Sequence, residues 1–355
     1  MNVPAAPDRT RSTSGVGADI LEAVERAVGF LDTCQLSSGE LPIYASTDPT
    51  LETGAKIDPS IFPNALAAWS LSFWPPAHPV RDRICDFLVA EMDPSGLWRH
   101  WPRSHPHHAS LPPDLDDSSC AAIALASAGR PSPDNRALLL ANRDRRGRFF
   151  TWLSPRLHWS GGAHLSLTWR QLAHAPTLYL FFTHSSAEPR DVDAVVNANS
   201  LFHLGRFDGD ETVVGFLVDA LRQGRERHCD KWYENPFVIW YFLARALAGR
   251  SDEAREMLLD KLDRSAPENA LESALSLCAM VALGRRPDED RMRSLLAQQL
   301  ADGSWRRAAL YHGGRGRLPD GRFAEPHPDT PRWGSEALTT AFAIEALGRW
   351  LETAS

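Results

Sequence analysis

The chain has 355 residues and a formal net charge of −7, from 38 basic and 45 acidic side chains. These charges form no long run of one sign, which argues against nucleic acid as the main partner. Hydrophobic residues make up 43 % of the chain, enough for a large core. No apolar run reaches the roughly 18 residues that a spanning helix needs, so no transmembrane segment is predicted.

The N-terminal residues are rich in Ser, Thr, Pro and Ala and lack an apolar core. This composition predicts a disordered tail over residues 1–15 and not a signal peptide. Residues 16–355 are predicted to form a single domain. The five cysteines are scattered, without a Cys-x-x-Cys pair, which indicates free thiols in a reducing compartment. We therefore expect a cytoplasmic protein, and the sequence leaves contact with a membrane surface open.

Helices of two kinds alternate along the rest of the chain. The predicted amphipathic helices cover residues 18–34, 79–92, 134–143, 209–225, 252–264 and 288–300. The predicted apolar helices cover residues 61–74, 116–128, 193–205, 235–248, 269–284 and 335–350. Apolar helices belong inside and amphipathic ones outside, and short connections make neighbours antiparallel. The pattern predicts an all-α fold, an (α/α)6 barrel of six inner and six outer helices with negligible strand content.

The less regular stretch over residues 145–190 interrupts this alternation. Long connections in compact domains are often functional. We expect this stretch to form an insertion over one mouth of the barrel. The N-termini of all six inner helices gather at one end in such a barrel, because the inner helices point the same way.

Three carboxylates lie within four residues, at Asp114, Asp116 and Asp117, between a proline pair and an apolar helix. Like charges this close cannot all stay ionised in a sheltered site, so one pKa should rise. A carboxyl group that is protonated near neutral pH can act as a general acid. The same residues also fit a helix N-cap and its first-turn partners. This stretch alone leaves both interpretations open.

The run Asp114-Leu115-Asp116-Asp117 resembles the Asp-x-Asp-Asp motif of class II terpene cyclases of the squalene–hopene cyclase type. The resemblance implies that Asp116 protonates an alkene or an epoxide. Asp114 and Asp117 would then hold its proton by hydrogen bonding and raise its pKa. Residues 298–305 are similar to a QW repeat of the prenyltransferase and squalene-cyclase superfamily, in which the glutamine ties helix ends together and the tryptophan stacks on it.

Degenerate copies of this repeat occur at three other turns. They are found at Gln35 with Gly39, at residues 94–98, and at Asp144 with Gly147 and Phe149. The resemblance implies structural roles for these residues.

The inner-helix starts bring further polar side chains to the end of the barrel that carries the acid run. Aromatic faces at this end would stabilise a cation. The candidate substrate-binding residues are Asp193, Asn197, Tyr233, Asn235, Glu336, Trp69, Trp101, Trp240 and Trp333. Among them, Asn197, Tyr233 or Asn235 could orient the acid or take the final proton.

The chain departs from the resembled family in one respect. Class II cyclases with this motif normally carry a second barrel domain, and the reaction chamber lies between the two. Here one barrel accounts for the whole chain. The substrate must therefore be enclosed in another way: by the insertion, by a homodimer or another partner, or by the interior of the barrel.

No metal ligand set is predicted. The chain lacks the Asp-x-Cys pair with which prenyltransferase β subunits hold zinc, and it lacks an Asp-Asp-x-x-Asp motif. The histidines of residues 100–108 do not have the fixed spacing of a structural zinc site. No redox cofactor is implied. Mg²⁺ would matter only for a substrate that carries a diphosphate, which Arg99, Arg103 or Arg170 could help to bind.

These observations together predict a class II-type terpene cyclase. It would start the cyclisation of a linear isoprenoid, or of an isoprenoid-bearing substrate, by proton transfer from the Asp-x-Asp-Asp acid. Two alternatives stay open. One is an α/α-barrel glycoside hydrolase or lyase with paired acids, and the other is a non-catalytic barrel that binds a lipid or a protein.

Overall fold

The computed structural model describes residues 15–353 except 157–158 and 160–161. The tail predicted over residues 1–15 lies outside the described residues apart from Gly15, which begins helix α1. Among the described residues, no helix combines the length and the apolar character needed to cross a membrane.

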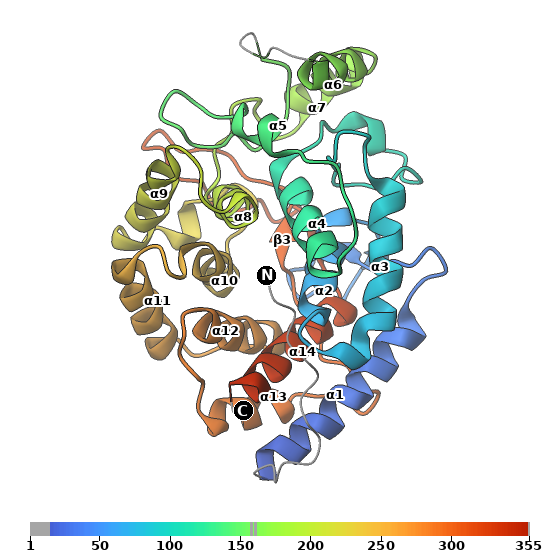
Figure 1. Ribbon diagram of the computed structural model, residues 1–355, viewed down its shortest axis with the longest axis vertical. Helices are drawn as coiled ribbons and strands as arrows, with labels where there is room; N and C mark the ends of the chain where they lie inside the picture. Colours follow the sequence, from blue (N-terminus) through green and yellow to red (C-terminus); the bar gives the residue numbers. More distant parts are fainter. Residues whose placement is uncertain (1–14, 157–158, 160–161, 354–355) are drawn as a thin grey trace.

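Six inner helices form a closed ring (Figure 1). They are α2 (Ile61–Leu71), α4 (Leu115–Ser127), α8 (Ala194–Leu204), α10 (Pro236–Leu247), α12 (Ala270–Ala282) and α14 (Glu336–Glu352). Each packs against the next, and α14 packs against α2. Helices α2 and α10 are buried almost all round, as their apolar sequences require. The predicted (α/α)6 barrel is confirmed.

Six outer helices surround this ring. They are α1 (Gly15–Cys34), α3 (His78–Glu91), α5 (Arg136–Leu140), α9 (Asp210–Arg222), α11 (Asp252–Arg264) and α13 (Glu289–Leu296). Helix α11 shows why they form: Ser251 caps its first turn by accepting the Ala254 N–H at 3.1 Å, and a stripe of Ala and Leu faces the ring.

Two outer helices are shorter than predicted. The helix expected over residues 134–143 is only α5, because the Asn142 amide leaves the helical path to donate to the carbonyl oxygens of Phe150 and Trp152. The helix expected over residues 288–300 ends at Leu296, where the glutamine turn begins.

The glutamine turns tie neighbouring outer helices together. The Gln299 amide donates to the carbonyl oxygens of Gly303, at 2.9 Å, and of Ala23 in α1, at 2.8 Å. Gln35 repeats this arrangement with Gly39 at 2.6 Å and with Val80 in α3 at 3.0 Å. These side chains hold the outer ring and line none of the cavities described below.

The tryptophan that follows such a turn is anchored in a similar way. The indole N–H groups of Trp305 and Trp98 each donate, at 2.8 Å, to a carbonyl oxygen of the preceding outer helix. Gly303 at the turn has a φ of +89°, and a Cβ there would meet the Arg26 carbonyl oxygen at 2.5 Å. Both observations give the turn residues a structural role.

A small antiparallel sheet joins two loops that precede inner helices. Its strands are β1 (Tyr44–Ser46), β2 (Lys56–Ile57), β3 (Tyr311–His312) and β4 (Arg332–Gly334), in the order β2-β1-β4-β3. In this register Tyr44 lies opposite Gly334, and Tyr311 lies opposite Trp333. Helical periodicity gave no signal for these short strands, which place two aromatic rings at the barrel mouth.

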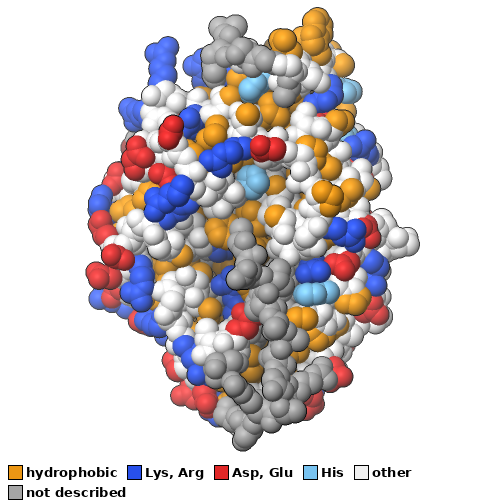
Figure 2. Space-filling model, in the orientation of Figure 1, with side chains coloured by type: hydrophobic (Ala, Val, Ile, Leu, Met, Phe, Trp, Pro, Cys, Tyr) orange, Lys and Arg blue, Asp and Glu red, His pale blue; other side chains and the backbone are white. Residues whose placement is uncertain are grey.

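The insertion predicted over residues 145–190 contains helices α6 (Gly162–Leu172) and α7 (Ala175–His184), at the upper end of Figure 1. Helix α7 packs on the short 3-10 helix His108–Ser110. Among the described residues of the insertion, five large apolar side chains are exposed, at Leu165, Trp169, Leu172, Tyr179 and Leu180. Figure 2 shows hydrophobic side chains gathered at this end of the molecule.

Candidate active site

The acid run forms the first turn of inner helix α4. The proline pair ahead of it favours an extended chain, and Asp114 follows in extended conformation as the N-cap. Its carboxylate accepts the Asp117 N–H at 2.8 Å. The capping interpretation therefore holds for Asp114. All three carboxyl groups are buried.

Asp116 is held by two side-chain donors from other helices and loops. The Asn199 amide donates to Oδ1 at 2.9 Å, and the Tyr233 hydroxyl donates to Oδ2 at 2.7 Å. Burial raises the pKa of Asp116 to about 7, although both hydrogen bonds lower it. The charges of Asp114 and Asp193 raise it further. A carboxyl group with this pKa is suited to general acid catalysis near neutral pH.

Asp114 and Asp117 form a pair of their own, which corrects the prediction that both hydrogen-bond to Asp116. Burial raises the pKa of both groups. The charge of Asp114 and a hydrogen bond to it raise the pKa of Asp117 further. His100 Nδ1 lies 3.9 Å from Asp117 Oδ2. Burial lowers the pKa of His100 to about 4, which leaves its imidazole neutral.

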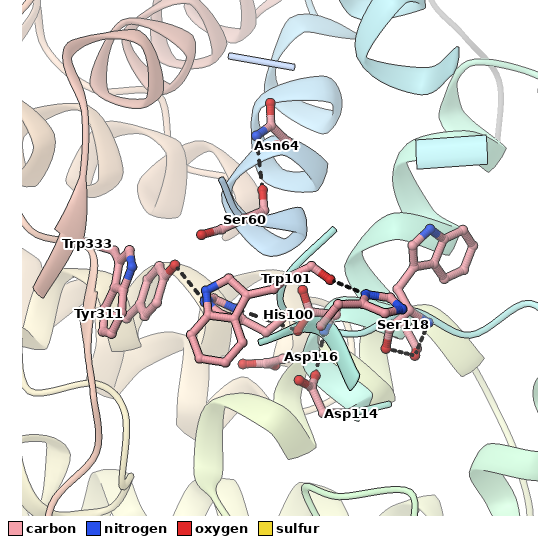
Figure 3. A network of polar contacts seen from close by, with 12 residues as sticks. Ser60, Asn64, His100, Trp101, Asp114, Asp116, Ser118, Tyr311 and Trp333 are labelled. Carbon is pink, nitrogen blue, oxygen red and sulfur yellow. Dashed lines mark hydrogen bonds and ion pairs between the residues drawn. The ribbon is translucent and has the colours of Figure 1, made fainter. Parts of the chain in front are cut away.

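A cavity of about 450 Å³ opens beside the acid run. We call it the acid cavity. Its aromatic lining residues are Phe62, Trp101, Trp152, Phe181, Trp232, Tyr233, Tyr311 and Trp333. The rings of Tyr311 and Trp333 stack at 5.2 Å between centroids, and Phe62 meets Tyr311 edge-on at 5.9 Å. Figure 3 shows Trp101, Tyr311 and Trp333 near Asp114 and Asp116. The wall around the acid is mainly aromatic.

A second cavity of about 720 Å³ lies at the same end and shares Tyr311 and His312 with the acid cavity. We call it the charged cavity. Its charged lining residues are Glu52, Arg227, Glu234, Glu268, Glu272, Arg306, Arg307 and Arg332. Several of these are paired: Arg332 lies 3.5 Å from Glu234, and Glu272 accepts from Asn235 at 2.8 Å. The acid run does not reach this larger cavity, so the smaller cavity is the candidate active site.

His312 stands in the wall between the two cavities. Its Nδ1 accepts the Gly314 N–H at 3.2 Å, which assigns the ring proton to Nε2. That Nε2–H is buried and has no hydrogen-bond partner among the described residues. Burial and the charges of Arg315 and Arg332 lower the pKa of His312 to about 3. His312 is therefore a neutral imidazole whose buried N–H is unpaired among the described residues.

The structure distributes the nine predicted substrate-binding residues over several places. Tyr233, Trp101 and Trp333 line the acid cavity. Asn235 and Trp240 line the charged cavity instead. Asn235 caps α10 and donates to Glu272, and the Trp240 indole donates to Glu226 at 3.3 Å.

Asn197 and Asp193 contribute to the fold and not to the lining of the acid cavity. Asn197 Oδ1 accepts the Phe149 N–H at 2.8 Å, as Asn64 Oδ1 accepts the Leu41 N–H at 2.7 Å. The fourth residue of two inner helices thus ties down the loop before it. Asp193 precedes α8 and accepts the Thr151 hydroxyl at 2.6 Å. Asn197 and Asp193 are predicted to bind substrate because they lie at the start of an inner helix. Side chains at the same position can instead anchor a loop, as these two do.

Glu336 and Trp69 also lie outside the acid cavity. Glu336, in the first turn of α14, accepts from Arg307 at 2.6 Å. Trp69 lies inside the barrel, where its ring meets Phe73 and Phe202 edge-on. Its depth along α2 places it well below the mouth.

Asn199 is a residue of the candidate site that was not predicted from the sequence. It is a fully buried amide on an inner helix that also carries Asn197 and Ser200. A buried polar group needs a partner, but the sequence alone does not distinguish Asn199, which donates to the acid, from Asn197, which anchors a loop.

The described residues contain no group of three or more His, Cys, Asp or Glu side chains placed to hold a metal ion. His105 pairs with Asp58 at 3.0 Å. The arginines named for a diphosphate are used in the fold: Arg170 pairs with Asp93 at 2.9 Å, Arg103 lies 3.7 Å from Glu91, and Arg99 donates to a loop carbonyl oxygen. None of the three lines the acid cavity.

A closed α/α barrel with a buried acid at its inner-helix N-termini is the architecture that this chain defines. No protein-family model matches the sequence, and no curated protein matches it. Solved structures do match. A protein from Actinoplanes gives a TM-score of 0.65 at 19 % identity, over 93 % of this chain and 99 % of that one.

Variants of the type II terpene cyclase MstE from Scytonema are also similar. The complex with geranylgeranyl dihydroxybenzoate as substrate gives a TM-score of 0.63 at 16 % identity, over 95 % of this chain and 99 % of that one. The complex with the product merosterolic acid A gives 0.63 at 16 %, over 95 % and 98 %. At these identities the likeness shows the fold: this chain has the fold of a type II terpene cyclase.

Proposed function

We propose that the protein is a class II-type terpene cyclase that protonates an isoprenoid, or the isoprenoid chain of a larger substrate. One observation carries the proposal. Asp116, which is 8 % exposed and has a pKa raised to about 7, lies in the wall of an aromatic cavity of about 450 Å³. A protonated acid that meets an apolar ligand in a water-poor space is what alkene protonation requires.

The proposed reaction begins with transfer of the Asp116 proton to one carbon of an alkene. The π electron pair forms the new C–H bond, and the neighbouring carbon becomes a carbocation. The next double bond of the chain attacks this carbon and closes a ring. Loss of a proton or capture by a nucleophile ends the sequence. An epoxide would accept the proton on oxygen and open to the same kind of cation.

The surrounding residues support this chemistry at both stages. Asn199 and Tyr233 donate to the carboxylate that remains after proton transfer, which stabilises the conjugate base. The aromatic faces of Trp101, Tyr311 and Trp333 stabilise positive charge in the cavity. No redox change occurs in this sequence, so the proposal includes no redox cofactor.

We infer that the insertion takes the place of a second barrel domain. Trp152 and Phe181, both from the segment between α5 and α8, line the acid cavity. Their rings meet edge-on at 5.2 Å between centroids. These side chains cover the acid from within one chain. A homodimer is therefore not needed by the proposal to shield the site from water.

The unpartnered donor on His312 supports an oxygen-bearing substrate. His312 lines both the aromatic acid cavity and the charged cavity, and its buried Nε2–H has no hydrogen-bond partner among the described residues. We propose that the isoprenoid chain occupies the acid cavity and that an oxygen of a polar end group accepts from His312. The neighbour MstE is bound to a substrate of this general build, geranylgeranyl dihydroxybenzoate.

A carbohydrate substrate fits the acid cavity less well. A sugar presents many hydroxyl groups, which need polar partners when they are buried. The acid cavity offers aromatic rings and few polar side chains besides the acid run. The paired-acid hydrolase is therefore not proposed.

The test is turnover in D₂O. The purified protein would be incubated with linear isoprenoids of graded length, with and without a phenolic or carboxylic end group, and products would be analysed by mass spectrometry and NMR. We expect a cyclic product with one deuterium on a ring carbon that does not exchange afterwards. Absence of cyclic products across this series, or cyclic products without deuterium, would contradict protonation as the first step.

A further inference from the structure

A chain of buried hydrogen bonds runs from Asp116 into the barrel interior. Asn199 donates to Asp116 and accepts, through Oδ1, from Arg245 Nη2 at 3.3 Å. Arg245 Nη1 lies 3.1 Å from the Tyr241 hydroxyl, which donates to Glu345 Oε2 at 3.0 Å. The chain crosses three inner helices, α8, α10 and α14. It connects the candidate acid with a charged side chain that touches neither cavity.

Arg245 is held firmly at its place in this chain. It is 5 % exposed, and its guanidinium lies 4.7 Å from the ring centroid of Phe202, 5.0 Å from that of Tyr241 and 5.4 Å from that of Phe242. A guanidinium packed among rings cannot rotate freely, and it carries N–H donors without any acceptor. The group that faces Arg245 must therefore be an acceptor.

This requirement fixes the orientation of the Asn199 amide. The carbonyl oxygen has to face Arg245, which leaves the NH₂ group facing Asp116 Oδ1. An NH₂ group can only donate, whereas the Tyr233 hydroxyl at Oδ2 can donate or accept. The acidic proton of Asp116 is thereby confined to Oδ2, while Oδ1 remains an acceptor in both protonation states.

We propose that Arg245 is a positioning residue for the acid: it locks the Asn199 amide so that this amide always donates to Asp116. The inference rests on the proposed function, because the acid that Arg245 adjusts is the one that would start cyclisation. Without the lock, the amide could rotate and present its carbonyl oxygen to a protonated Asp116. The protonated form would then be favoured, and Asp116 would be a weaker acid.

Other titratable groups face Asp116 from the elements around it. They are Asp114, Asp117 and Cys120 on α4, Asp193 at the start of α8, and Asp230 and Tyr233 before α10. Replacing Arg245 or Asn199 removes none of these groups, although Cys120 loses its contact with Arg245 in Arg245→Met. A change in the titration midpoint of Asp116 can thus be assigned either to the orientation of the Asn199 amide or to the charge of Arg245. A double variant distinguishes these two causes.

A purely structural role for Arg245 would be to neutralise the buried Glu345. That carboxylate has other partners: Ser70 donates to it at 2.7 Å, and Arg349 Nε lies 3.2 Å from Oε1. The second guanidinium nitrogen of Arg245 points to Asn199 and not to Glu345. The structural role therefore leaves this contact unexplained.

The test measures Asp116 protonation directly, in protein without substrate. The infrared carboxyl band of Asp116, identified by its absence in Asp116→Asn, is recorded against pH. We expect its titration midpoint to rise on the order of one pH unit in Arg245→Met and in Asn199→Ala, since each loses a hydrogen bond to a charged group. The double variant Arg245→Met/Asn199→Ala should titrate like Asn199→Ala alone, because Arg245 acts on Asp116 only through the Asn199 amide.

Three results would overturn the proposal. One is an unchanged midpoint in Arg245→Met, and another is a double variant in which the two shifts add, as a direct charge effect would. The third is an equal shift in the control Ser70→Ala, which loosens the far end of the chain without touching Asn199. If Arg245→Met does not fold, Arg245→Met/Glu345→Gln removes the charges on both sides of the Tyr241 hydroxyl and should show the same shift.

Failure of this inference and failure of the proposed function can be told apart. The infrared band needs no isoprenoid, so it reports on the lock even if no substrate is ever turned over. Where turnover is found, the pH profile of cyclisation should move upward with the band in Arg245→Met, with a lower maximal rate. A reduced rate with an unmoved profile would also count against the lock.

Discussion

Two acidic clusters lie at the starts of neighbouring inner helices, and only the first of them lines the acid cavity. The first is Asp114, Asp116 and Asp117 at α4, and the second is Asp191, Asp193 and Asp230 around the start of α8. Burial raises the pKa of every one of these carboxyl groups. The two clusters are therefore alike in burial and in the direction of their pKa shifts.

They differ in what surrounds the carboxyl oxygens. Asp230 accepts the backbone N–H groups of Val195 and Trp232 at 2.8 and 2.9 Å, and Asp191 pairs with the buried Lys231 at 2.6 Å. None of the second cluster lines the acid cavity. These contacts tie residues 230–232 to α8, directly before Tyr233, and so hold that hydroxyl against Asp116.

The comparison teaches that a buried carboxyl group with a raised pKa is not by itself a catalytic acid. It must also face the space in which the substrate lies. Asp116 meets this condition and Asp193 does not. The second cluster supports the position of the first. Substitutions in the second cluster should therefore reduce the stability of the fold more than the rate of the proposed reaction.

The largest expected effect is on cyclisation by Asp116→Asn. The amide keeps the shape and the partners of the acid but cannot release a proton to an alkene, so we expect a loss of about 10²- to 10⁴-fold in rate. Asp193→Asn is the matched variant from the other cluster. It should lower the melting temperature while the folded protein keeps most of its rate. Comparable rate losses in the two variants would erase the distinction between the clusters.

Asp191→Asn should cost the most stability. It leaves the Lys231 ammonium, whose side chain is 1 % exposed, without its counter-charge. Removing one partner of a buried ion pair typically costs about 3–5 kcal/mol in free energy of unfolding, which urea titration would measure. The double variant Asp191→Asn/Lys231→Met removes both charges and should recover much of the loss. A single variant as stable as the wild type would mean that this pair does not anchor the loop.

Asp116 should also make stability depend on pH. Its pKa is about 7 in the folded chain against an ordinary value of 3.8, so both states hold the proton below about pH 4. Between pH 4 and 7 the unfolded chain releases the proton first, and the free energy of unfolding falls by about 4 kcal/mol before it levels off. Asp116→Asn lacks this dependence. Urea titrations of both proteins from pH 4 to 8 should diverge in favour of the variant, and a constant difference would contradict the raised pKa.

The barrel could be predicted from the sequence because its inner and outer helices differ in local hydrophobic periodicity. Apolar helices such as α10 and amphipathic ones such as α11 differ in composition all along their length. The short strands β3 and β4 carry no such signal, since two or three residues cannot show a period. They pair through a register between distant loops, and this register brings Tyr311 beside Trp333.

The candidate site was predictable only in part. The acid run is contiguous, so spacing alone pointed to Asp116. Its partner Asn199 lies 83 residues away and is recognised only once α8 packs against α4. Asn197 and Glu336 sit at the predicted end of the barrel, but position on a helix does not say whether a side chain binds a loop or a ligand. That choice depends on contacts between segments that are distant in sequence.

The smallest expected effect separates the two roles of Asp114. Its carboxylate caps α4 at 2.8 Å, so Asp114→Ala should lose about 1 kcal/mol of stability. Its negative charge also raises the pKa of Asp116, so the acid should titrate at lower pH in this variant. Asp114→Asn keeps the cap without the charge, and it should retain the stability while showing the same downward shift in the Asp116 carboxyl band. If only Asp114→Ala loses stability and neither variant moves the band, Asp114 is only a cap, and the first cluster adjusts its acid through Asn199 and Tyr233 alone.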